Sequence, residues 1–254
     1  MTNTDAIELT TANPNALFVA NAGSLSNAAN VIVDDACEAL VLTDGYAFKA
    51  PADFTASVAT YQRALAAGKT TTVCLPFAIG NTEAAAMGTF YVLSSFDGST
   101  LHFTPVDAPQ ANTPYLLVPT GTSMSLSLSD VFVPATPANL AVEASDAEFI
   151  GTMAPTGVPA NDATYSYYAY NNGEFVKVVT TAATLPAFRG YFKVANGSAG
   201  SRFLGVSFDD ATGIEKMRDG ESERMRSVIF DLSGRCVAKT QKGVYIVNGK
   251  KVVQ

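Results

Sequence analysis

Short runs of alternating apolar and polar residues fill most of the first 208 positions, and this period of two is typical of half-buried β-strands. Asn, Asp, Gly and Pro separate the runs, with turn signals roughly every 8–12 residues. Strands are predicted at 17–19, 30–33, 39–43, 115–118, 123–128, 131–133, 149–152, 166–170, 174–179 and 190–194. Because no long helical pattern intervenes, we expect an all-β, sandwich-like body of antiparallel strands and hairpins, not a βαβ fold.

The clearest hairpin joins residues 89–96 to residues 100–106 through Asp97-Gly98-Ser99. An Asp-Gly pair favours the positive φ angles of a tight turn. Strand alternation places Leu101 and Phe103 on one face of the returning strand and His102 on the other.

Two segments have a pattern that includes helical signals. Residues 56–66 form either an Ala-rich helix or the first strand of a hairpin that turns at 67–69 and returns at 70–76, and periodicity does not decide between them. Residues 82–87 predict one or two helical turns before Gly88.

Composition and charge divide the chain. Of its 254 residues 48% are hydrophobic and 15% charged, so it can bury a core. Residues 1–208 hold 7 Lys and Arg against 16 Asp and Glu, whereas 209–254 hold 9 against 7. The acidic body argues against nucleic-acid binding, which needs cations set against phosphates. We predict a β-sandwich-like body at 1–208 (one domain or two subdomains), a charged linker at 209–226 and a small β tail at 227–254.

Candidate catalytic chemistry is sparse. His102 is the single histidine, no partner for it can be named from the sequence, and no nucleophile, zinc or phosphate-binding motif is present. The acidic doublets Asp34-Asp35 and Asp209-Asp210 suit turns better than a carboxylate pair, because adjacent strand residues point to opposite faces. The three cysteines have neither disulfide-framework nor zinc-site spacing, and Cys74 is expected to be a small core residue. We therefore predict a non-enzymatic protein with no catalytic residue, metal or cofactor.

A tyrosine cluster is the one candidate ligand platform. Tyr168 and Tyr170 fall on one face of a strand, with Tyr165 and Tyr167 on the other. Aromatic rings stack on sugars, so Tyr168 and Tyr170 are candidate sugar contacts, although aromatic residues in hairpins more often pack across strands.

The C-terminal tail carries the most specific pattern: residues 230–237, FDLSGRCV, and residues 242–253, KGVYIVNGKKVV. It resembles the "YDLxGRxV … KGxYIVxGKKV" ending of secreted and surface proteins of gut Bacteroidota, and is similar to the C-terminal sorting domain of the type IX secretion system. The resemblance implies export to the outside of the cell or its outer surface, with the secretion machinery as partner. The implied sorting residues are Gly234, Arg235, Gly243, Tyr245, Ile246, Lys250 and Lys251.

Four stretches of the body, 40–51, 73–77, 111–117 and 185–192, resemble an uncharacterised module that precedes such tails in large surface proteins. In that module the CLPF segment, here 74–77, ends a strand, which favours a hairpin at 56–76. The start of the chain lacks the basic and apolar regions of a signal peptide, and the resemblance implies that further residues precede it. No apolar run reaches 18 residues, so no transmembrane helix is expected.

Together these features predict a structural or adhesive module of a secreted or cell-surface bacterial protein, with a glycan or a host or matrix surface as further partner. The alternative is a carbohydrate-binding accessory module of a larger secreted glycoside hydrolase.

Overall fold

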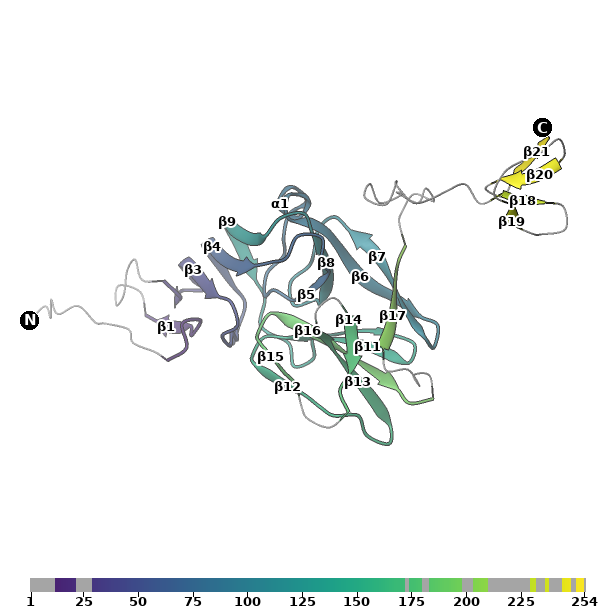
Figure 1. The fold of residues 1–254 in the computed structure, drawn as a ribbon. Helices are drawn as coiled ribbons and strands as arrows, with labels where there is room; N and C mark the ends of the chain where they lie inside the picture. The colour runs from purple at the N-terminus through teal and green to yellow at the C-terminus, as the bar shows by residue number, and fades with distance from the viewer. Residues whose placement is uncertain are drawn as a thin grey trace, which may run out of the picture. The chain divides into compact units, whose positions relative to one another are not determined.

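The structure is a computed structural model that describes residues 12–21, 29–171, 174–179, 183–197 and 203–209, and the backbone of four short tail strands. The chain divides into two compact units, Met1–Ala211 and Thr212–Gln254. Figure 1 shows their elements, which within the described residues are strands apart from a single helix, α1 (Asn81–Met87). The prediction of an all-β protein is confirmed.

The first sheet has five strands in the order β1-β2-β3-β4-β9. Their bounds are β1 (Phe18–Ala20), β2 (Val31–Val33), β3 (Ala36–Thr43), β4 (Phe54–Ala64) and β9 (Ser123–Val133). Strand β4 pairs in parallel with β3 and antiparallel with β9, which forms the edge. Asp34 and Asp35 have φ angles of 48° and 61° and form the two-residue turn between β2 and β3, as predicted for this doublet.

The second sheet has ten strands in the order β10-β11-β16-β13-β14-β17-β7-β6-β8-β5. Their bounds are β5 (Thr71–Val73), β6 (Gly88–Phe96), β7 (Thr100–Val106), β8 (Tyr115–Pro119), β10 (Ala141–Ala144), β11 (Ala147–Thr152), β13 (Tyr165–Asn171), β14 (Glu174–Lys177), β16 (Arg189–Ala195) and β17 (Phe203–Phe208). The sheet curls so that strands far apart in its order come into contact. The backbone N–H of Gly190 in β16 donates a hydrogen bond to Thr72 Oγ1 of β5 at 3.1 Å.

Two further sheets are small. Strands β12 (Thr156–Val158) and β15 (Ala183–Leu185) form an antiparallel pair. The C-terminal unit has four strands in the order β19-β18-β20-β21. They are β18 (Ile229–Asp231), β19 (Cys236–Val237), β20 (Val244–Val247) and β21 (Lys250–Val253), and all their pairings are antiparallel.

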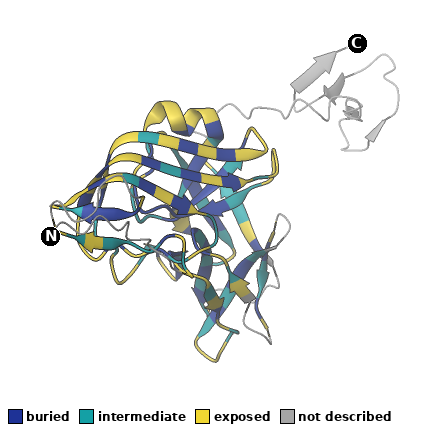
Figure 2. Cartoon of the chain, turned by 90° about the vertical axis from the view of Figure 1, so that its left-hand side faces the viewer, coloured by how far each residue is buried: buried dark blue, intermediate teal, exposed yellow. Residues whose placement is uncertain are grey.

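Strand β8 explains why the body is layered. Its Tyr115 and Leu117 point into the core shared with the first sheet, whereas Leu116 between them points into a second core enclosed by the curled sheet. Both faces of β8 are therefore buried, which is why its sequence is a continuous apolar run and not an alternating one. Strands covered on one face show the alternation of buried and exposed residues, visible as banding in Figure 2. The result is sandwich-like.

The predicted 89–106 hairpin is confirmed as β6 and β7, with Gly98 at a φ of 96°. Leu101 and Phe103 are fully buried and His102 is not, as alternation predicted. The helical turns at 82–87 are confirmed as α1. The runs at 123–128 and 131–133 form one strand, β9, in which Asp130 takes a φ of 54°.

The hairpin predicted for 56–76 is wrong, although its first segment is a strand and not a helix. Strand β4 lies in the first sheet and β5 pairs with β8 in the second. The contact between the two segments is made by a side chain: Arg63 donates hydrogen bonds to Thr72 O at 2.8 Å and to Thr71 Oγ1 at 2.7 Å.

No helix in the part of the chain that the structure describes is long and apolar enough to cross a membrane.

Candidate functional site

The four stretches 40–51, 73–77, 111–117 and 185–192 meet at the junction of the two large sheets. The Cys74 amide donates to Phe188 O at 3.4 Å, the Ala187 amide to Gly45 O at 3.4 Å, and the Asn112 amide to Leu75 O at 2.7 Å. Backbone hydrogen bonds thus join the first stretch to the fourth, the fourth to the second and the second to the third. The four stretches therefore build one structural feature.

A charged network lies at the centre of this junction. Arg189 donates from Nη1 to Asp44 Oδ1 at 2.8 Å and from Nη2 to Asp44 Oδ2 at 2.7 Å, a bidentate pair. Tyr61 donates its hydroxyl to Asp44 Oδ1 at 2.6 Å, and its ring meets Phe188 edge to face at 5.3 Å. Asp44 follows β3, Tyr61 belongs to β4 and Arg189 begins β16, so the network ties the first sheet to the second.

In this network Asp44 and Arg189 stay ionised and Tyr61 stays protonated. Burial alone would raise the pKa of Asp44, but hydrogen bonds from Arg189 and Tyr61 outweigh it and hold this pKa below its ordinary value. Burial and the adjacent Asp44 raise the pKa of Tyr61 well above its usual range. Burial and the neighbouring Arg189 lower the pKa of Arg63 to about 10, which leaves it protonated at neutral pH. These polar groups are engaged in holding the layers together.

Two cysteines also belong to the packed interior. Cys37 and Cys74 are free thiols, both completely buried. Burial raises the pKa of Cys74 to about 12, so the thiolate that reacts and binds metals is suppressed. The prediction that Cys74 is a core residue is confirmed. The side chain of Cys236 lies outside the described residues.

His102 has acidic neighbours that the sequence analysis missed. Its Nε2 lies 3.2 Å from Asp97 Oδ2, and its Nδ1 lies 3.9 Å from Asp209 Oδ1. Strand β17 pairs in parallel with β7 and so brings Asp209 beside His102. The sequence patterns did not predict β17, so they gave no reason to place Asp209 next to this histidine. Asp97 also accepts hydrogen bonds from the Ser99 and Thr100 amides, which hold its pKa far below the ordinary value. This carboxylate is an acceptor that fastens the β6–β7 turn.

The predicted tyrosine platform is wrong for Tyr168. Tyr168 is completely buried in the second core, so its ring cannot stack on a sugar. Alternation correctly placed Tyr168 and Tyr170 on one face of the strand, but that face is turned towards the core. Tyr170 on the same face is partly buried and lines a cavity of about 240 Å³ together with Glu174, Phe175 and Phe208. On the opposite face, the Lys193 ammonium lies 4.1 Å from the centre of the Tyr165 ring.

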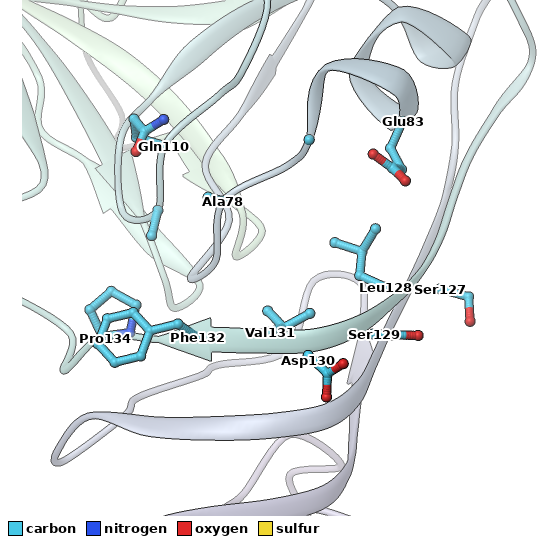
Figure 3. A pocket seen from close by; sticks show the side chains of 12 residues that line it. Ala78, Glu83, Gln110, Ser127, Leu128, Ser129, Asp130, Val131, Phe132 and Pro134 are labelled. Atoms are coloured by element: carbon cyan, nitrogen blue, oxygen red, sulfur yellow. The ribbon is translucent and has the colours of Figure 1, made fainter.

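A larger cavity, of about 750 Å³, borders β9 (Figure 3). One side is formed by the 127–132 segment of β9 with Pro134, and the other by Ala78, Gly80 and Glu83 at the start of α1 with Gln110 and Ala111. No sequence motif pointed to it. The one sequence feature at this place is a serine-rich strand in which Asp130 is the single charged residue.

Some of the predicted sorting residues lie in the part of the chain that the structure describes and others do not. Tyr245 and Ile246 lie on β20, Lys250 and Lys251 on β21, and the register pairs Ile246 with Lys251. Gly234, Arg235 and Gly243 lie outside the described residues, as do Asp210 and most of the predicted linker.

No protein-family model, curated protein or solved structure matches the chain.

Proposed function

We propose that the chain is a non-enzymatic structural or adhesive module of a secreted or cell-surface bacterial protein, delivered through its C-terminal tail. The observation that carries the structural part is the Asp44–Arg189–Tyr61 network, at the place where the four shared stretches meet. Groups that are charged and buried are the usual candidates for catalysis. Here they hold two sheets together, and burial suppresses the reactivity of two thiols.

The tail supports the delivery part. Its resemblance to a type IX sorting domain involves turn glycines and terminal lysines, neither of which packing alone would require. Lys250 and Lys251 begin the last strand, and the positive charge that they give it is suited to contact with an acidic receptor surface.

Deleting residues 243–254, behind a signal peptide in a host with type IX secretion, is expected to leave the protein in the periplasm. Gly243→Val, or Lys250→Glu with Lys251→Glu, should lower surface delivery while the body stays folded. Protease accessibility on intact cells and fractionation measure this. The matched control, Lys49→Glu with Lys69→Glu, reverses two exposed charges on the body and should be delivered normally. Surface display of the deletion variant would rule out export through the tail.

A carbohydrate-binding module is the second candidate, and the cavity beside Tyr170 favours it. A tyrosine with two phenylalanines and the Glu174 carboxylate combines an apolar ring surface with a hydrogen-bond acceptor, the two features by which proteins hold sugars.

On this alternative, Tyr170→Ala should abolish retention on a glycan array, while Tyr165→Ala, on the opposite face of the same strand, should keep it. Equal retention by both variants, or no retention of the unaltered protein by any glycan, would exclude this cavity as a sugar site.

A further inference from the structure

We infer that the free edge of β9 binds an extended, basic peptide, which adds to the first sheet as a sixth strand. The inference rests on the geometry and charge of β9 and its cavity, and it is independent of export through the tail.

The edge has the length that strand addition needs. β9 pairs with β4 from Ser123 to Val133, and its hydrogen bonds to described residues are those of that ladder. In an antiparallel pair, the backbone groups of alternate residues point away from the partner strand. An edge strand therefore presents a row of N–H and C=O groups that a further strand can satisfy.

The cavity lies along this row. Its lining takes in consecutive β9 residues from Ser127 to Phe132 and then Pro134, a stretch of about 20 Å at the rise of a strand. Figure 3 shows the other wall, at α1 and the loop that carries Gln110, facing β9 across the opening. A strand edge opposite a short helix leaves room for a single extended segment, the arrangement used in peptide recognition by β-augmentation.

Charge selects the occupant. Glu83 and Asp130 are the ionisable residues of the lining, and no Lys or Arg is among its residues. Phe132, next to Pro134, is 57% exposed and offers an apolar contact. A peptide that carries Lys or Arg together with an apolar side chain satisfies both features.

The same charges disfavour a second copy of this chain. Asp130 is the one ionisable residue of β9, so pairing two β9 strands brings carboxylates together without a cation. The register with β4 is the same on both sides of Asp130, so the carboxylate and not a break in the ladder opposes pairing between copies. A basic peptide offsets the charge that keeps another copy away.

The test uses the full chain and a fluorescein-labelled eight-residue peptide of alternating lysine and valine, followed by fluorescence anisotropy. Three results are expected. The peptide binds, its glutamate–valine counterpart does not, and methylation of alternate backbone nitrogens on the lysine–valine peptide abolishes binding. The last comparison separates strand addition from simple charge attraction, because methylation removes the donors and leaves the charges.

Asp130→Asn and Glu83→Gln should each weaken binding about fivefold, the size of one exposed charge contact. Asparagine tolerates positive φ, so Asp130→Asn keeps the backbone. Glu143→Gln removes an exposed carboxylate from β10 in the other sheet and should leave binding unchanged. Binding that survives methylation, that ignores the Asp130 and Glu83 variants, or that is replaced by dimerisation of the protein would overturn the inference, as would no binding of the basic peptide.

Discussion

Replacing Phe192 with alanine is expected to lower the free energy of unfolding by about 3–5 kcal/mol. The ring is completely buried in the second core, where it stacks on Phe149 at 4.4 Å and meets Phe175 and Phe103 edge to face at 4.7 and 6.0 Å. Three strands besides its own contribute these rings, so neighbouring backbones cannot collapse into the space. The variant loses both the transfer free energy of the ring and the packing around it.

Urea denaturation followed by circular dichroism measures this change. Phe132→Ala is the matched control, because the same side chain is removed from a position that is 57% exposed. Its stability should change by no more than about 0.5 kcal/mol. Similar losses for both variants would mean that the second core is not packed as described.

Arg189→Leu is expected to cost about 2–4 kcal/mol, because it leaves the partly buried Asp44 carboxylate without its bidentate partner. The side chains of Arg189 and Asp44 are 14% and 28% exposed, so the loss should fall short of that for a fully buried pair. The guanidinium also donates to Ala187 O at 3.1 Å, which adds to the loss.

The pair should also shape the acid side of the stability profile. The pKa of Asp44 is lower in the folded protein than in the unfolded chain, so its contribution is present above the unfolded value and is lost as pH falls through the folded one. Below about pH 4 the unaltered protein should therefore lose stability more steeply than the Arg189→Leu variant.

Lys193→Leu is the control for Arg189→Leu. Lys193 and Glu148 are also 2.7 Å apart, but their contact is a single hydrogen bond between side chains on the outer face of the sheet. Its loss should cost less than about 1 kcal/mol. If Lys193→Leu were as costly as Arg189→Leu, the junction network would have no special part in joining the sheets.

Local features of the body were predictable because they depend on neighbours in the chain. The 89–106 hairpin follows from Asp97-Gly98 between two apolar runs, and α1 from an alanine-rich segment before Gly88. The candidate site was less predictable. Alternation grouped Tyr168 with Tyr170 correctly, yet it could not say that this face is turned towards a core.

What the sequence determined by itself is therefore the class of the protein. A period of two, turn residues at short intervals and the absence of a long helical pattern require strands, wherever those strands lie. The tertiary structure alone decided the partners. The local sequence of β4 is compatible with pairing to β5 or to β9. In the folded chain β4 pairs with β9, and its Ala59 and Tyr61 are buried in the first core. Asp44 meets Arg189 across 145 positions, and nothing in the sequence near either residue indicates that they pair. The position of β9 at the edge of the first sheet, among the strands that the structure describes, likewise depends on tertiary pairing.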